Sequence, residues 1–246
     1  MTADQDGVDR APAGLSGPLP PPRRQLALHT FGVVLLGVLA AAALYVGAAG
    51  TGPTAADAAA LDESIELRSG GLTLFATVLT HAGSTASMAV LALLVALWSL
   101  YHGRRVDAAL VFGAMAGASL LFRGLKLLID RPRPPLVSRL ADVASESLPS
   151  GHATMSMVVI GTLVVLAWAG LGRAARGTMV AAAAVWVGGV GATRIYLGVH
   201  WFSDVVAGWL VGGAWLATCV AAWSWWRARR PTPRPTPPAT NGTFVL

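Results

Sequence analysis

Six long runs of apolar residues, nearly free of charge, constrain what this chain can fold into more than any other feature. They lie at about residues 26–49, 86–101, 108–128, 152–171, 178–196 and 204–225. A helix that crosses a bilayer needs roughly 20 mostly apolar residues. Only 12% of the chain is charged, against about a quarter of a typical soluble domain. The sequence therefore predicts an all-α integral membrane protein, a bundle of six transmembrane helices.

Two runs in the N-terminal half leave alternatives. The run at 86–101 is short, so residues 72–81 before it either extend it or lie along the membrane interface. The run at 26–49 could be a signal peptide, but it exceeds the roughly 7–15 apolar residues usual there, which favours an uncleaved anchor.

The predicted domains are a disordered tail at 1–25, a transmembrane domain at 26–226 and a disordered tail at 227–246.

Arginines in the short connections between the runs predict the orientation of the bundle. Cytoplasmic loops of membrane proteins carry an excess of Lys and Arg. With six spans, four arginine-bearing segments share one side, which predicts cytoplasmic termini: the two tails and the turns at 102–107 and 172–177. This topology accounts for the net charge of +6, so no nucleic-acid partner is expected. The loop at 129–150 falls on the opposite side yet carries Arg131, Arg133 and Arg139, which suggests a bound anion.

The first polar cluster that topology does not explain surrounds Lys126, the only lysine among the 18 Lys and Arg residues. Pro132 and Pro134 disfavour helical angles in the residues before them. The third run should therefore end soon after Lys126 and let Arg133 fold back beside it. A lysine that snorkels from a helix end to the membrane surface is the alternative.

The second cluster is Pro149-Ser150-Gly151-His152, at the start of the fourth run. The N-terminus of a helix exposes free backbone N–H groups and favours anions. Ser150 can cap the helix or donate to an oxygen, and Gly151 lets the backbone approach a ligand closely. A plain helix cap with a turn is the alternative, but it does not explain His152.

The third cluster is the segment TRIYLGVHWFSD at 193–204, which joins the fifth and sixth runs. Asp204 is the only acidic residue after Glu146, and His200 precedes it by four positions, which places both on one face if the stretch is helical. A carboxylate beside a histidine orients the ring and stabilises its cation. A carboxylate placed to favour a helix start is the alternative for Asp204, and it leaves Arg194 unexplained.

The predicted topology brings all three clusters to the extracytoplasmic ends of the third to sixth spans. Their three cations, helix N-terminus, two histidines and carboxylate suit a phosphoryl group. Cations and N–H groups would hold its oxygens, one histidine would attack phosphorus, and the other would protonate the leaving oxygen. The chain has no carboxylate cluster of the kind that holds magnesium, so neither a metal nor a cofactor is expected.

In this order the clusters resemble the motifs of the type 2 phosphatidic acid phosphatase superfamily, whose core is shared with vanadium haloperoxidases. The family pattern is Lys, six residues, Arg-Pro; then Pro-Ser-Gly-His; then Ser-Arg, five residues, His, three residues, Asp. This chain reads KLLIDRPRP from Lys126, PSGH from Pro149 and TRIYLGVHWFSD from Thr193, where threonine replaces the family's serine. The resemblance covers about residues 70–225.

The resemblance implies a role for each matching residue. His200 would be the nucleophile that forms a phosphohistidine, with Asp204 orienting it. His152 would be the general acid and then the base that activates water. The residues expected to hold phosphate are Lys126, Arg133, Ser150, Gly151 and Arg194.

Three further polar residues near the clusters match no motif position. Arg123 and Arg131 are expected to contact a substrate head group or lipid at most. His81 could face the site, but a position at the membrane interface is favoured.

The implied function is removal of phosphate from a lipid whose tail stays in the bilayer of the plasma membrane. Undecaprenyl diphosphate, phosphatidylglycerol phosphate and phosphatidic acid all remain open as substrates. A lipid phosphotransferase that uses the same phosphohistidine is the alternative enzyme, and its product distinguishes it. A transporter is disfavoured, because transporters place polar residues near the bilayer midplane. The oligomeric state is left open.

Overall fold

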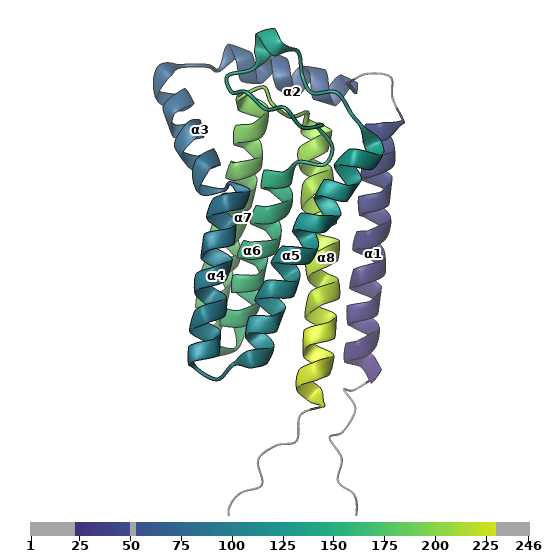
Figure 1. Ribbon diagram of the computed structural model, residues 1–246, viewed down its shortest axis with the longest axis vertical. Coiled ribbons are helices and arrows are strands. Elements are labelled where there is room, and N and C mark those ends of the chain that lie inside the picture. Colours follow the sequence, from purple (N-terminus) through teal and green to yellow (C-terminus); the bar gives the residue numbers. More distant parts are fainter. Residues whose placement is uncertain (1–22, 50–52, 230–246) are drawn as a thin grey trace, which may run out of the picture.

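The computed structural model describes residues 23–49 and 53–229, and that part of the chain is helical without any strand (Figure 1). The helices are α1 (Arg23–Ala48), α2 (Ala55–Glu66), α3 (Gly70–Ala82), α4 (Thr85–Tyr101), α5 (Arg105–Ile129), α6 (Gly151–Ala167), α7 (Arg173–Tyr196) and α8 (Phe202–Ala228). Short 3-10 turns occur at Leu136–Ser138 and Trp168–Gly170. The predicted all-α class is confirmed, whereas most of both predicted disordered tails lies outside the described residues.

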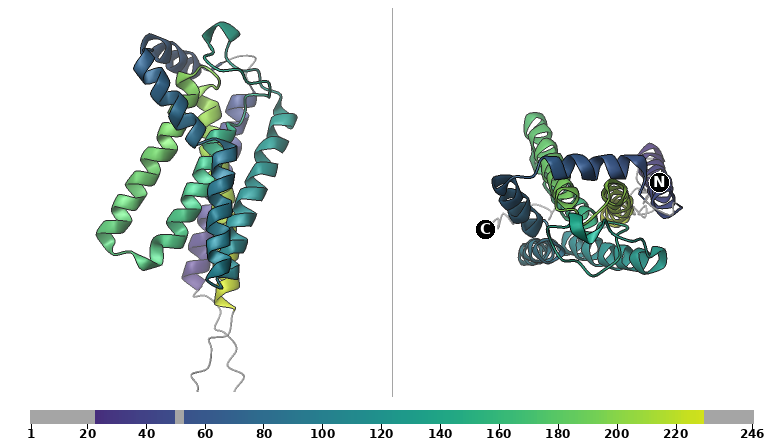
Figure 2. Two further views of the ribbon diagram at one scale, coloured as in Figure 1. Left: turned by 60° about the vertical axis from the view of Figure 1, so that its left-hand side comes forward. Right: turned by 90° about the horizontal axis from the view of Figure 1, so that it is seen from above.

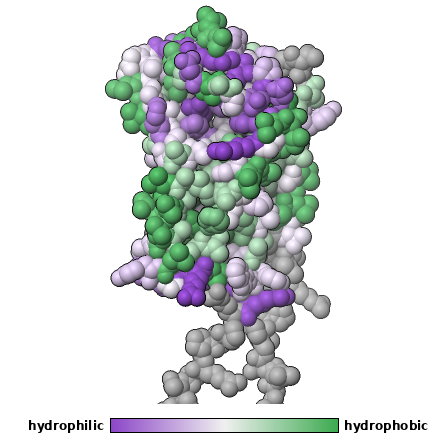
Figure 3. Space-filling view, in the orientation of Figure 1, coloured by the Kyte–Doolittle hydropathy of each residue, from purple (hydrophilic) through white to green (hydrophobic). Residues whose placement is uncertain are grey.

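Five of the described helices, α1, α5, α6, α7 and α8, are long and apolar enough to cross a membrane. A sixth span results if α3 and α4 form one crossing, broken by a bend of 44°. The short second run therefore corresponds to α4, which has 17 residues, and residues 72–81 lie within α3. Figure 3 shows the hydrophobic surface as a band along the middle of the bundle, between two more polar ends.

The two ends of the bundle carry different segments of the chain. α1 begins and α8 ends at the same end, where the α4–α5 and α6–α7 turns also lie (Figure 1). The arginine-bearing turns that were predicted to share one side therefore do so, while the assignment of that side to the cytoplasm stays a prediction. At the opposite end, α2 lies across the bundle beside the loop that follows α5 (Figure 2).

Helix α2 forms in the acidic segment after the first run, where no helix was predicted. It begins with a capping box, in which the Thr54 hydroxyl accepts a hydrogen bond from the Asp57 N–H (3.1 Å). In return, the Asp57 carboxylate accepts one from the Thr54 N–H (3.0 Å). This reciprocal pair satisfies backbone donors at the helix start and so fixes the position of Asp57.

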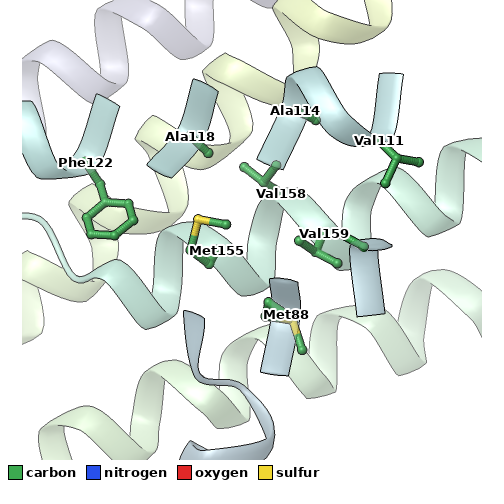
Figure 4. Close-up of a cluster of buried hydrophobic side chains, with 9 residues drawn as sticks. Met88, Val111, Ala114, Ala118, Phe122, Met155, Val158 and Val159 are labelled. Atoms are coloured by element: carbon green, nitrogen blue, oxygen red, sulfur yellow. The ribbon is translucent and has the colours of Figure 1, made fainter. Parts of the chain in front are cut away.

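Close packing of α6 against its neighbours aligns the starts of α6 and α8. Apolar side chains of α4, α5 and α6 form the core in Figure 4, including Met88, Phe122 and Met155. On the other side of α6, Gly208 of α8 faces it, and a Cβ there would lie 2.8 Å from the Ser150 carbonyl oxygen. Small residues let helices in a membrane approach closely. The Ser150 N–H consequently donates to the Asp204 carbonyl (3.0 Å), which joins two of the predicted clusters.

Candidate active site

All three predicted clusters meet at the α2 end of the bundle, around one cavity of about 520 Å³. Six of the eight predicted site residues line this cavity: Lys126, Arg133, Gly151, His152, Arg194 and His200. The other two, Ser150 and Asp204, are fully buried beside it. The structure thus brings together residues from the end of α5, the loop after it, the start of α6, the end of α7, the turn between α7 and α8, and the start of α8.

The two ring nitrogens of His200 have different neighbours: Nδ1 contacts buried polar side chains, and Nε2 lies beside Arg133, which also lines the cavity. Nδ1 is 3.3 Å from Asp204 Oδ2 and 3.4 Å from the Ser147 hydroxyl. The Arg133 Nη1 atom lies 3.1 Å from Nε2. Burial lowers the pKa of His200 to about 3, although the hydrogen bond to Asp204 acts in the other direction. The imidazole is therefore neutral at pH 7, and donation of Nδ1–H to Asp204 leaves the lone pair on Nε2.

Two cations of the site fasten the loop that precedes α6. Arg133 donates from Nε to the Ser145 carbonyl (2.6 Å) and from Nη2 to the Glu146 carbonyl (3.0 Å). Lys126 donates from Nζ to the same Glu146 carbonyl and to the Ser147 carbonyl (3.2 Å). Burial lowers the pKa of Arg133 to about 10, so its guanidinium remains charged at neutral pH. The predicted fold-back of Arg133 toward the end of α5 is confirmed by these shared partners.

Two buried donors of the site have no hydrogen-bond partner among the described residues: the Ser150 hydroxyl and Arg194 Nε. Ser150 stands at the N-cap of α6, yet its side chain makes no capping bond, contrary to the plain-cap alternative. The Arg194 side chain is held from its other end, where Nη1 donates to Thr80 Oγ1 on α3 (2.7 Å). Buried polar groups without partners are unfavourable. A tetrahedral oxyanion in the cavity would satisfy both donors and the free N–H groups at the start of α6.

The expectation that Arg131 contacts lipid or a head group is wrong. Its side chain is almost buried, and Nη1 donates to Asp204 Oδ1 (2.6 Å) while Nη2 donates to Asp57 Oδ2 (2.9 Å). Part of the positive charge of the 129–150 loop is therefore neutralised within the chain. Sequence reasoning missed Asp57 and Ser147, because Asp57 precedes the motifs and Ser147 belongs to none.

The remaining polar residues near the clusters have simpler positions. Arg123 is exposed and lines the cavity, one helical turn before Lys126. His81 is exposed at the end of α3, with Nδ1 2.7 Å from the Thr77 carbonyl, and it does not line the cavity. The Thr193 hydroxyl donates to the Val190 carbonyl of its own helix (2.6 Å). The hydroxyl at position 193 therefore makes a hydrogen bond within α7 and is not directed to a partner in the cavity.

The turn that presents His200 depends on Gly198. This residue has a φ of +67°, and a Cβ there would lie 2.1 Å from the Ser138 carbonyl oxygen. We expect Gly198→Ala to lower the free energy of unfolding by at least about 1 kcal/mol, the penalty for a side chain in the left-handed region. We also expect it to reduce activity, because His200 follows two residues later. Gly188→Ala, where a Cβ would meet nothing within 4 Å, is the matched control on α7. Thermal unfolding in detergent measures both variants, and equal melting temperatures would contradict this view of the turn.

Comparisons with known proteins agree with this arrangement of helices. A model of the PAP2 superfamily matches residues 107–229, half of the chain. Phosphatidylglycerophosphatase B of Bacillus subtilis (strain 168) is 29% identical over 160 residues, which cover 64% of this chain and 78% of that protein. The crystal structure of the first transmembrane PAP2 type phosphatidylglycerolphosphate phosphatase from Bacillus subtilis matches with a TM-score of 0.69 at 25% identity, covering 77% of this chain and 94% of that one. Aquifex aeolicus LpxE shares the fold, with a TM-score of 0.56 at 22% identity over 68% of this chain and 96% of that one.

Fold, site and relatives together define an integral membrane enzyme of the lipid phosphatase class. The chain belongs to the PAP2 superfamily. The resemblance inferred from its three motifs is thereby confirmed.

Proposed function

We propose that this protein hydrolyses the phosphate monoester of a membrane lipid, with phosphatidylglycerol phosphate as its first substrate, at the outer surface of the plasma membrane. The observation that carries the proposal is the cavity lined by His152 and a neutral His200, with the unpartnered donors of Ser150 and Arg194 beside it. The names of the Bacillus subtilis relatives support the choice of lipid. The distribution of arginines supports the outer face.

The first step transfers the phosphoryl group to the enzyme. His200 Nε2 attacks phosphorus, the bond between phosphorus and the lipid oxygen breaks, and His152 donates a proton to that oxygen. Asp204 accepts the Nδ1–H hydrogen bond and stabilises the positive charge that the ring acquires. Arg133, now beside Nε2, would donate to a phosphate oxygen instead.

The second step returns the enzyme to its starting state. Water loses a proton to His152 and attacks phosphorus, the phosphorus–nitrogen bond breaks, and free phosphate leaves. Lys126, Arg133 and Arg194 would offset the charge on the oxygens in both steps, together with the Ser150 hydroxyl and the Gly151 N–H. Because the chain itself supplies these donors, the proposed reaction needs no metal ion.

The rim of the cavity supports a lipid substrate over a soluble one. It includes Phe122 and Leu127 of α5 and Thr85 at the start of α4. Leu127 is 77% exposed on the surface of a helix that is apolar enough to span the membrane. A phosphate bound in the cavity could therefore remain attached to a tail that lies in the bilayer.

Phosphate release in excess EDTA tests the substrate and the absence of a metal together. Detergent-purified protein would be offered phosphatidylglycerol phosphate, phosphatidic acid and undecaprenyl diphosphate side by side. We expect phosphatidylglycerol phosphate to be hydrolysed fastest, with EDTA and added magnesium giving equal rates. A preference for the diphosphate would overturn the choice of substrate, and a strict magnesium requirement would overturn the mechanism. A phosphorylated acceptor in place of free phosphate would identify a phosphotransferase.

A further inference from the structure

A buried charge network lies behind the cavity, and of its three residues only Asp204 takes part in the steps above. It consists of Asp57 on α2, Arg131 in the loop after α5, and Asp204 at the start of α8. The exposed fractions are 0% for Asp57, 7% for Arg131 and 0% for Asp204. Asp57 lies outside the segment that matches the PAP2 model, so the family motifs do not point to it.

Arg131 joins the two carboxylates through different nitrogens. Nη1 donates to Asp204 Oδ1 over 2.6 Å, and Nη2 donates to Asp57 Oδ2 over 2.9 Å. The other oxygen of Asp204, Oδ2, faces His200 Nδ1 and accepts the Trp201 N–H (2.9 Å). One carboxylate oxygen of Asp204 thus contacts Arg131, and the other contacts His200.

Asp57 is itself fixed to the start of α8 as firmly as to α2. Its Oδ1 accepts the Ser203 N–H (2.7 Å), and its Oδ2 accepts the Ser203 hydroxyl (2.8 Å). Burial alone would raise the pKa of Asp57, but the hydrogen bonds from Ser203, Thr54 and Arg131 hold it below its ordinary value. Asp57 is therefore a carboxylate anion at neutral pH, adjacent to the residue that precedes Asp204.

The charges of this network explain why a second carboxylate is present. Arg131 and Asp204 alone sum to zero, so Arg131 would cancel the negative charge that His200 needs when it becomes a cationic phosphohistidine. With Asp57 the three groups sum to one net negative charge. An opposite charge nearby stabilises the cationic ring.

We propose that Asp57 is a positioning residue for the reaction: it balances and anchors Arg131, so that Asp204 keeps its orientation and its charge toward His200. This inference rests on the proposed phosphohistidine mechanism. Asp57 contacts neither the cavity nor the reacting atoms, and it acts through Arg131.

The test compares Asp57→Asn with Asp62→Asn, an exposed carboxylate on the same helix. We expect Asp57→Asn to lower kcat by about 10- to 100-fold, the size of effect that slight misplacement of reacting groups produces. KM should stay within about twofold of the wild-type value, because no residue proposed to hold phosphate changes. Asp62→Asn should match the wild type in both constants. Rates are expressed per folded protein, counted as the monodisperse fraction in detergent, so a loss of folded protein alone would leave kcat unchanged and would contradict the proposal.

A double variant shows whether Asp57 acts through Arg131 or independently of it. Asp57→Asn combined with Arg131→Gln restores one net negative charge, so the double variant should be no slower than Asp57→Asn alone. If the losses of kcat caused by the two substitutions multiply in the double variant, the inference is overturned.

If Asp57→Asn does not fold, Ser203→Ala decides the question. This substitution removes the hydroxyl that contacts Asp57 and Arg131, and kcat should fall by about fivefold, the equivalent of one hydrogen bond. An unchanged kcat in Ser203→Ala would then overturn it.

The wild type and His200→Ala, run in the same assay, test the underlying mechanism separately. Activity that persists in His200→Ala would overturn the phosphohistidine itself. A normal kcat in Asp57→Asn, beside an inactive His200→Ala, would overturn only the role of Asp57.

Discussion

His200→Ala is expected to fold normally and to lose phosphate release by at least about 10⁴-fold, the scale seen when an enzyme loses its nucleophile. The loss should be this large because His200 is the cavity histidine whose Nδ1 contacts a carboxylate, which leaves its Nε2 as the proposed nucleophile. Folding should survive, since Asp204 retains its contacts with Arg131, Ser147 and the Trp201 N–H. Initial rates of phosphate release and thermal unfolding in detergent measure the two halves of this prediction.

The matched control is His102→Ala, at the arginine-bearing end of the bundle. His102 is exposed, and its Nδ1 atom lies 2.8 Å from the Trp98 carbonyl of its own helix. We expect wild-type rates for it. Substantial phosphatase activity in a folded His200→Ala protein would mean that another group attacks phosphorus.

His152→Ala is expected to reduce lipid turnover by about 10²- to 10⁴-fold, the usual contribution of a general acid and base. His152 lines the cavity and makes no hydrogen bond to another described side chain, so its ring is free to transfer protons. The proposed mechanism uses it twice, to protonate the leaving oxygen and to activate water. Steady-state rates with phosphatidylglycerol phosphate measure the loss.

A substrate with a good leaving group separates the two uses of His152. p-Nitrophenyl phosphate needs little protonation when its ester bond breaks, so His152→Ala should release nitrophenol in a burst. The phosphohistidine should then accumulate, because its hydrolysis lacks the base. A variant that turns over p-nitrophenyl phosphate continuously at the wild-type rate would contradict the second use of His152.

Much of the fold could be predicted because apolar length and loop charge are local properties of the sequence. The six runs correspond to α1 and α4 to α8, and the shortness of the run at 86–101 corresponds to the bend between α3 and α4. Helix α2 escaped prediction because residues 55–66 are mostly alanine and acidic residues, which suggested an outer loop. Its formation depends on the capping box and on contacts with α7 and α8.

The candidate site was predictable where its residues fall into motifs with fixed spacing. The contact of His200 with Asp204 follows from their separation of four positions, even though α8 begins only at Phe202. The Arg131 contacts were not predictable, because one of its partners is 74 residues earlier in the chain and the other 73 residues later. Long-range ion pairs of this kind depend on how α2 crosses the bundle, and no local pattern encodes that.

The most direct test of the central claim is to look for the phosphohistidine itself. Purified protein would be mixed with phosphatidylglycerol phosphate labelled at its terminal phosphate, quenched in alkali to preserve phosphohistidine, digested, and mapped by mass spectrometry. The proposed mechanism predicts label on His200 that forms at least as fast as phosphate is released and is absent from His200→Ala. Steady release of phosphate without label on His200, or with label on another residue, would contradict it.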